Sequence, residues 1–319
     1  MLARKYPDRF RHNQRADFTL LDNLKAVRDR LTQGDSKRPT LATDIVHDLL
    51  ARLIFVQFLF QRQDSQGRSA LDAAFLLRLH KEGRLRGRHA NLGSVLRDHA
   101  DTYALFRFLD QRFNGDLFPG KDLPNEQRDQ AWAKEMVEVR QAHLNFLADF
   151  VAGELHLPSS QLALWPLYAF DAIPLEFVSS IYEAFVHKRN DTVYTPVSLV
   201  DFLLDGVLPW DGEDWDLRIL DPACGSGVFL VRAFQRLVHR WRQANPGQEP
   251  KGVLLSSLLE NNLYGVDIDP AAIRVASFSL YLALCDELDP RSYWEQIRLP
   301  SLRGRRLIRG DSSTRPCPD

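Results

Sequence analysis

The chain has 319 residues, of which 45% are hydrophobic and 26% are charged, and its formal net charge is −1. This composition is typical of a soluble globular protein, and the length favours two domains. The three cysteines, Cys224, Cys285 and Cys317, lie far apart in the sequence, which excludes a disulfide scaffold and predicts no metal site. No segment is apolar over the length that a signal peptide or a membrane span needs, so we expect a cytoplasmic protein without a membrane partner.

Charge is unevenly distributed along the chain. Residues 1–120 contain 21 Lys and Arg against 14 Asp and Glu, whereas the remainder contains 20 against 28. A basic first part favours contact with nucleic-acid phosphates, because neutralising phosphates releases their bound counterions. The alternative is an ordinary solvated surface with evenly spread charges.

Helical periodicity dominates the first part of the chain. Apolar residues recur at helical spacing in five segments, which are residues 18–31, 41–60, 70–80, 127–155 and 175–186. The apolar face of residues 41–60 is suited to a buried central helix. Turn-forming residues predict linkers at 61–69 and 113–125. Because no strand alternation interrupts the pattern, residues 1–190 are predicted to form a mostly α-helical domain.

A short basic segment begins in the last turn of the third predicted helix and continues beyond it. It contains five cations, which are Arg78, Lys81, Arg84, Arg86 and Arg88. These residues are the best candidates in the chain for contact with DNA phosphates. A solvent-facing loop without a partner is the alternative, because Gly83 and Gly87 also mark ordinary loops.

The pattern changes after residue 211 to strands that alternate with helices. Short aliphatic runs predict strands over residues 217–220, 263–268 and 306–309. Helical patterns over residues 228–244, 254–261 and 270–284 separate them. Alternation of this kind indicates an α/β fold with a parallel sheet and helices on its faces.

The first predicted strand runs into the string Asp-Pro-Ala-Cys-Gly-Ser-Gly at residues 221–227, and a helix follows directly. Gly225 and Gly227 allow a sharp strand-to-helix turn and a close approach of a ligand to the backbone. No Lys-Ser or Lys-Thr pair follows the glycines, which excludes a phosphate-binding Walker loop. A structural turn in an unrelated α/β domain is the alternative.

The second predicted strand brings a carboxylate to its end. Asp267 can accept hydrogen bonds from both hydroxyls of a ribose at this position. It lies 42 residues after Gly225, whereas the acidic residue of a dinucleotide fold follows after about 20 residues. This spacing argues against NAD. Asp269 precedes Pro270 and is predicted to cap the next helix.

The string at residues 221–227 resembles motif I of class I methyltransferases. Its residues are most similar to the form of this motif in enzymes that methylate exocyclic amines of DNA. The resemblance implies that S-adenosylmethionine is the cofactor, that Asp221 binds its methionine ammonium and that Asp267 binds its ribose. Ile268 would pack on the adenine, and Asp311 would accept from the adenine amino group. The cofactor-binding residues implied are Tyr194, Thr195, Pro196, Asp221, Ala223, Cys224, Gly225, Ser226, Gly227, Phe229, Asp267, Ile268 and Asp311.

Residues 193–200 resemble motif X, which contacts the methionine end of the cofactor in this class. Thr195 and Pro196 also read as a plain helix start, with Thr195 as the N-cap. Both roles are compatible.

Four segments of the first part resemble the helical region that precedes the methylase in large single-chain restriction–modification and phage-exclusion methyltransferases. They are residues 50–59, 113–118, 170–174 and 181–185. The likeness covers about residues 40–312, although relatives often have glycine where Asp116 stands. It implies a type IIG-like, N6-adenine-specific DNA methyltransferase of a restriction–modification or phage-defence system, with double-stranded DNA as its partner.

The family's catalytic motif, an Asn/Asp/Ser-Pro-Pro-aromatic string that holds the flipped-out base, does not occur in the 319 residues. We therefore predict no catalytic residue here. The predicted architecture is a helical N-terminal domain, followed at residues 191–319 by the first half of a Rossmann-like class I methyltransferase sheet that ends after motif III. We expect little activity from this chain alone. The explanation that we favour is a fragment of a larger methyltransferase. The alternative is that a further chain supplies the catalytic half, or that specificity or restriction subunits join it.

Two alternatives remain from the sequence. One is a DNA-binding or scaffold subunit that does not catalyse. The other is methylation of a different planar amine, such as cytosine N4, a guanine of ribosomal RNA or a protein glutamine, because motif I does not separate these substrates.

Overall fold

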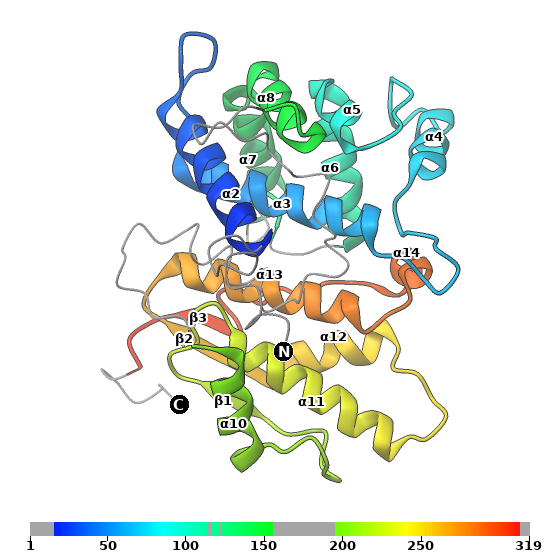
Figure 1. The fold of residues 1–319 in the computed structure, drawn as a ribbon, viewed down its shortest axis with the longest axis vertical. Coiled ribbons are helices and arrows are strands. Elements are labelled where there is room, and N and C mark those ends of the chain that lie inside the picture. The colour runs from blue at the N-terminus through cyan, green and yellow to red at the C-terminus, as the bar shows by residue number, and fades with distance from the viewer. Residues whose placement is uncertain (1–15, 114–116, 121–122, 156–194, 313–319) are drawn as a thin grey trace, which may run out of the picture.

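The computed structural model describes residues 16–113, 117–120, 123–155 and 195–312 (Figure 1). The predicted domain boundary at residue 190, the predicted helix at 175–186 and Tyr194 lie outside the described residues. In Figure 1 the helices of the first part form the upper half, and the α/β part forms the lower half.

The described residues of the first part are helical, as predicted. The helices are α2 (Ala16–Gln33), α3 (Thr43–Gln61), α4 (Ala73–Lys81), α5 (Leu92–Leu96), α6 (His99–Phe113), α7 (Asn125–Glu138) and α8 (Gln141–Ala152). The predicted central helix is α3, which buries residues on all its sides, including Val46, Leu50 and Phe55. A helix buried all round lies inside its domain.

The prediction of one helix over residues 127–155 is wrong. The chain leaves the helical conformation at Val139, which adopts an extended backbone between α7 and α8. The side chain of Val139 is buried, and its carbonyl accepts a hydrogen bond of 2.7 Å from Nε2 of His99. A tertiary contact therefore stabilises a corner that sequence periodicity does not reveal.

The second part is an α/β unit. Its elements are α10 (Val197–Val207), β1 (Ile219–Asp221), α11 (Val228–Ala244), α12 (Gly252–Asn261), β2 (Leu263–Asp267), α13 (Pro270–Asp286), the 3₁₀ turn η4 (Pro290–Ser292), α14 (Tyr293–Gln296) and β3 (Leu307–Arg309). The strands are parallel in the order β1-β2-β3, with β2 in the centre. The predicted alternation of strands and helices around a parallel sheet is thus confirmed.

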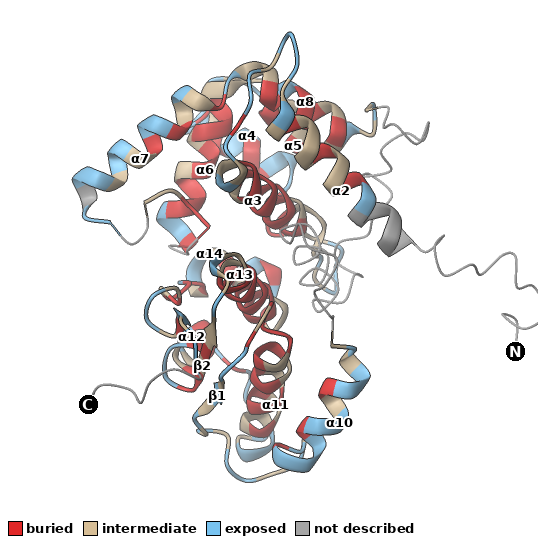
Figure 2. Cartoon of the chain, turned by 90° about the vertical axis from the view of Figure 1, so that its left-hand side faces the viewer, coloured by how far each residue is buried: buried red, intermediate tan, exposed pale blue. Residues whose placement is uncertain are grey.

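The two faces of the sheet differ in burial. Helices α11 and α13 pack against each other and against the same face, whose residues Leu263 and Leu307 are buried. On the other face the strand register pairs Leu220 with Tyr264, and Val266 with Ile308. Leu220 is 61% exposed there, and no described helix covers it. Figure 2 likewise shows α11 and α13 largely buried and α10 largely exposed.

Specific contacts join the helical part to the α/β part. At one end of α13, Nη1 of Arg274 lies 3.3 Å from Oδ1 of Asp44, at the start of α3. At the other end, Nη2 of Arg62 lies 2.6 Å from Oδ1 of Asp286. Helices α3 and α13 therefore run alongside each other in the same direction. Among the described helices, none combines the length and the apolar composition that crossing a membrane requires.

Candidate functional site

The turn at residues 221–227 needs both of its glycines, for different reasons. Gly225 and Gly227 have φ angles of 51° and 84°, in the left-handed region that favours glycine. A Cβ on Gly227 would lie 3.0 Å from the Cα of Ala276, so this glycine lets the turn approach α13. A Cβ on Gly225 would meet nothing within 4 Å. The space beside Gly225 is open to a ligand.

Hydrogen bonds hold this turn against the end of β2. The Cys224 amide donates to the Val266 carbonyl at 2.9 Å, and the Gly225 amide donates to Oδ2 of Asp267 at 2.9 Å. Oδ1 of Asp267 accepts from the Asp269 amide at 2.8 Å. Each carboxylate oxygen can still accept a further hydrogen bond. Asp267 is thus fixed in place and able to bind two hydroxyl groups.

Asp221 has an unusual environment. Its Oδ1 accepts from the Ala223 amide at 3.1 Å, whereas its Oδ2 is buried and has no hydrogen-bond partner among the described residues. Burial raises the pKa of Asp221, and the charge of Asp267 raises it further, against the opposing hydrogen bond. Leaving a buried carboxylate oxygen unpaired is unfavourable. A cationic donor such as an ammonium group would satisfy it.

Apolar groups complete the site. Ile268, directly after β2, is 70% exposed and offers an apolar surface at the strand end. Phe229 lies half-buried in the first turn of α11. The Cys224 side chain is buried below the turn, and burial raises the pKa of its thiol to about 12. That thiol therefore remains neutral and acts as part of the apolar floor.

The structure brings most of the predicted cofactor residues together. The turn 221–227, Asp267, Ile268 and Asp311 lie at the carboxyl ends of three adjacent parallel strands, where α/β sheets bind ligands. Asp311 follows Gly310, whose amide donates to the Asp267 carbonyl at 2.9 Å. Asp269 caps α13 as predicted, since its Oδ1 accepts from the Ala271 amide at 2.8 Å.

The predicted motif X is seen only in part. Thr195 and Pro196 are described, and no hydrogen bond or ion pair in the described residues joins them to the turn 221–227. The alternative in which Thr195 caps the helix is wrong by one residue, because Pro196 is the N-cap and contributes only its carbonyl. Helix α10 thus has no side-chain cap. Ion pairs from Asp201 to Arg232 and Arg236 hold it on α11.

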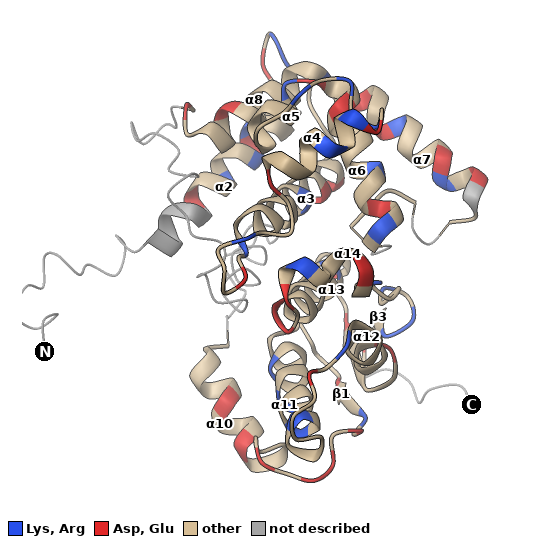
Figure 3. Ribbon diagram, turned by 90° about the vertical axis from the view of Figure 1, so that its right-hand side faces the viewer, with Lys and Arg blue, Asp and Glu red and all other residues tan. Residues whose placement is uncertain are grey.

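The predicted DNA-contact residues lie elsewhere. Arg78 and Lys81 belong to α4, and Arg84, Arg86 and Arg88 to the loop after it, on the side of the molecule that faces the viewer in Figure 3. All five are exposed. Helix α4 contacts the α/β part through Phe75, whose ring stacks on Trp294 at 4.4 Å, beyond the far end of α13. Because α13 has 17 residues, about 25 Å of helix separates this contact from Asp269.

A cavity of about 330 Å³ lies at this junction, and Arg68, Phe75, Arg78, Arg291 and Trp294 are among the residues that line it. It is remote from the turn 221–227, so the cofactor candidates do not line it. The described residues contain no group of three or more His, Cys, Asp or Glu that could hold a metal ion.

Sequence reasoning missed a group beside the basic loop. The Asp101 carboxylate accepts a hydrogen bond from the Gly87 amide of the loop, and Nε2 of His89 lies 2.7 Å from the same carboxylate. Only Gly87 gave a sequence signal, as a loop marker, because Asp101 lies in helix α6, which periodicity did not predict.

Comparison with known proteins identifies relatives of the α/β part. Residues 215–292, which run from before β1 to the end of η4, match the family described as "MmeI, DNA-methyltransferase domain". The adenine-specific methyltransferase PglX of Streptomyces coelicolor is 30% identical over 113 residues, covering 34% of this chain and 9% of PglX. The putative type II restriction enzyme and methyltransferase RM.MjaORFECS2P of Methanocaldococcus jannaschii is 41% identical over 81 residues, covering 23% of this chain and 6% of that protein.

Among solved structures, a cryo-electron microscopy structure of a DrdV–DNA complex aligns with 97% of this chain and 25% of the DrdV chain. The sequence identity is 17% and the TM-score is 0.36.

These matches confirm the resemblance to DNA adenine methyltransferases of restriction–modification and phage-defence systems. They do not favour the alternative of a scaffold subunit or of another amine as substrate. The chain spans less than a tenth of the length of the two relatives described above.

Proposed function

We propose that the α/β part is the S-adenosylmethionine-binding portion of a DNA adenine-N6 methyltransferase of a restriction–modification or phage-defence system. The observation that carries this proposal is the buried, unpartnered Oδ2 of Asp221 beside the fixed carboxylate of Asp267. The match of residues 215–292 to a methyltransferase family supports it. When bound, S-adenosylmethionine supplies the electrophilic methyl group.

The residues of the turn and strand ends divide the cofactor between them in this proposal. Asp221 binds the methionine ammonium, because its buried oxygen lacks a cationic partner. Asp267 accepts from the ribose hydroxyls, and Ile268 packs on the adenine. The backbone of residues 223–227 runs along the methionine and ribose, where the open space beside Gly225 leaves room.

The remaining contacts of this proposal rest on the sequence resemblance. Phe229 contributes apolar surface from α11, Asp311 accepts from the adenine amino group, and Tyr194, Thr195 and Pro196 approach the methionine end.

The exposed sheet face indicates what completes the domain. Among the described strands, β1 pairs only with β2, and Leu220 and Ile308 expose apolar side chains on the uncovered face. We infer that residues 191–319 form the first half of a class I sheet, preceded by a helical domain up to residue 190. Further polypeptide would cover this face and supply the catalytic motif. In this proposal the chain binds cofactor and DNA in the cytoplasm and transfers little methyl by itself.

Calorimetric titration of S-adenosylmethionine into the full chain tests the proposal. Asp267→Ala removes hydrogen bonds to a charged acceptor, each worth about 1.5–3 kcal/mol, so affinity should fall on the order of 10- to 100-fold. Asp214→Ala is a matched control, because Asp214 is an exposed aspartate ahead of β1. Equal affinity of the Asp267→Ala variant and the unaltered chain, or no binding by the unaltered chain, would overturn the assignment.

A further inference from the structure

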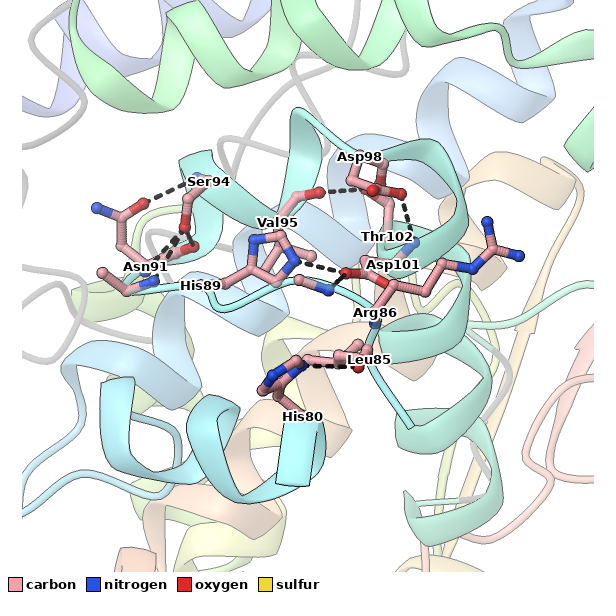
Figure 4. Close-up of polar contacts among 12 residues, drawn as sticks. His80, Leu85, Arg86, His89, Asn91, Ser94, Val95, Asp98, Asp101 and Thr102 are labelled. Carbon is pink, nitrogen blue, oxygen red and sulfur yellow. Dashed lines mark hydrogen bonds and ion pairs between the residues drawn. The ribbon is translucent and has the colours of Figure 1, made fainter. Parts of the chain in front are cut away.

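The loop between α4 and α5 is folded around one buried carboxylate. Asp101, in the first turn of α6, is 1% exposed. Its Oδ1 accepts from the Arg86 amide at 2.7 Å, and its Oδ2 accepts from the Gly87 amide at 2.7 Å. Nε2 of His89 lies 2.7 Å from the same Oδ2 (Figure 4). Three hydrogen bonds to one side chain thus fix the centre of the loop.

Burial raises the pKa of Asp101, but the hydrogen bonds from Arg86, His89 and Gly87 lower it more, so the group remains ionised. Gly87 itself fits closely against this arrangement. A Cβ at this position would lie 3.0 Å from Nε2 of His89 and 3.3 Å from Oδ2 of Asp101. The small residue at position 87 therefore lets the backbone reach the carboxylate.

Both ends of the loop are anchored as well. At its start, Nδ1 of His80 donates to the Leu85 carbonyl at 3.1 Å, and the Leu85 side chain is buried. At its end, the Ala90 amide donates to Oγ of Ser94 at 3.1 Å, and the Ser94 amide donates to Oδ1 of Asn91 at 2.9 Å. The segment from α4 to α5 is held along its whole length.

The cations of this loop point away from the clamp. Positions 85, 87 and 89 are buried or half-buried, whereas Arg84, Arg86 and Arg88 between them are exposed. Arg84 has an acidic neighbour, with its Nε 3.3 Å from Oε2 of Glu82. Within the described part of the chain, the guanidinium groups of Arg86 and Arg88 have no acidic partner.

We propose that residues 84–88 form a preorganised contact for the backbone phosphates of duplex DNA, and that Asp101 is the positioning residue that holds this contact in shape. The choice of duplex DNA as the partner rests on the proposed function. Unpaired exposed arginines complement phosphates, and a loop already ordered by its own hydrogen bonds loses less entropy on binding than a free loop. The contact lies on DNA that flanks the methylated base, because α13 separates the loop from the cofactor site.

The direction in which Asp101→Asn changes DNA affinity distinguishes a positioning role of Asp101 from a simple effect of its charge. Asp101→Asn removes a negative charge close to the arginines, so electrostatics alone predicts tighter DNA binding. Loss of the clamp predicts the opposite, a decrease of about 3- to 10-fold, because immobilising each side chain again costs about 0.5–1.5 kcal/mol. The measurement is fluorescence anisotropy of a labelled DNA duplex with the full chain over a salt series.

Further variants identify the groups involved. Arg86→Ala and Arg88→Ala should each weaken binding and reduce the salt slope by about 0.9, whereas Arg305→Ala, an exposed arginine before β3, is the matched control. In the Arg86→Ala/Arg88→Ala background, Asp101→Asn should have no further effect, which a general loss of structure would not produce. If Asp101→Asn does not fold, Gly87→Ala disturbs the same clamp without changing any charge.

The outcomes separate this inference from the proposed function. Tighter or unchanged DNA binding by Asp101→Asn, or an equal loss in the Arg86→Ala/Arg88→Ala background, would overturn the positioning role. Unchanged salt slopes for Arg86→Ala and Arg88→Ala, or preference for an RNA duplex over DNA, would overturn the phosphate contact. In each case the calorimetric test of cofactor binding remains an independent measure of the α/β site.

Discussion

At the residue scale, the environment of Asp221 opposes stability. Its buried Oδ2 has no partner among the described residues, and burial raises its pKa. A core position selected for stability alone would not keep such a group. The sequence string predicted a role for Asp221 by resemblance. The structure adds a physical reason to propose it, because one oxygen accepts from Ala223 and the other has no partner among the described residues.

This arrangement predicts that stability and cofactor affinity change in opposite directions with pH, and that Asp221→Asn removes both changes. Because the folded-state pKa of Asp221 is raised, the ligand-free chain loses stability as pH rises from the ordinary aspartate pKa through the raised one. Affinity for S-adenosylmethionine should increase over the same pH range, since the ionised carboxylate binds the ammonium. Asp221→Asn should abolish both trends, which thermal melting and calorimetry at several pH values would measure. A pH-independent affinity of the unaltered chain would contradict this role.

The glycines of the turn make a second prediction at this scale. Gly225→Ala, Gly227→Ala and Gly247→Ala all place a side chain at positive φ, which costs roughly 1–2 kcal/mol. Gly247 has open space around it, as Gly225 has, whereas Gly227 contacts Ala276. Urea unfolding should therefore show Gly227→Ala as the least stable of the three variants.

The same set separates folding from binding. Gly225→Ala should match Gly247→Ala in stability but bind S-adenosylmethionine more weakly, because its methyl group occupies the ligand space. Equal affinity of these two variants would show that the ligand does not approach Gly225.

At the element scale, the sequence predicted the α/β part closely. The predicted helix at 228–244 is α11, and the helix at 270–284 begins as predicted at Pro270, because a proline preceded by a capping aspartate marks a helix start. Helix α6 was missed because its buried face includes Asp101, Thr102 and Asp110, which interrupt the apolar periodicity. Polar residues that serve tertiary contacts conceal a helix from pattern analysis.

Helix α10 gives the prediction at this scale. Arg236 is fully buried in its contact with Asp201 of α10, and Asp205 is a second, exposed partner of the same guanidinium. Burial raises the pKa of Asp201, but the hydrogen bonds from Arg232 and Arg236 lower it by more than burial raises it. The pKa of Asp201 therefore lies below the ordinary value. The stabilisation is present above the ordinary aspartate pKa and is lost as pH falls through the lowered one.

Asp201→Asn should therefore destabilise the chain by about 2–3 kcal/mol, because it removes the charge that pairs with the buried guanidinium of Arg236, although Asp201 itself is only partly buried. Asp205→Asn should cost less than about 1 kcal/mol, since its carboxylate is exposed. Chemical denaturation gives both values. Relative to the unaltered chain, Asp201→Asn should speed up hydrogen exchange more in α10 than in α11. Similar losses for the two variants would exclude a special role of Asp201 in anchoring α10.

At the scale of the whole molecule, two candidate sites lie at opposite ends of α13. The proposed cofactor residues Asp267 and Ile268 directly precede the N-cap of α13, Asp269, whereas the basic loop follows α4, whose Phe75 stacks on Trp294 beyond the last turn of α13. The sequence identified both groups of residues but not their relative positions in the fold. Those positions depend on contacts between residues more than 200 positions apart, such as Arg62 and Asp286. Such pairs have no local pattern.

Hydrogen–deuterium exchange of the full chain, with and without S-adenosylmethionine, tests the central claim most directly, because it locates the ligand without any substitution. We predict that the cofactor slows exchange at residues 221–227, 267–269 and 310–311, and leaves the turn at Gly247 and the basic loop at residues 84–88 unchanged. Absence of protection at the carboxyl ends of β1 and β2, or protection confined to the helical part, would contradict the account.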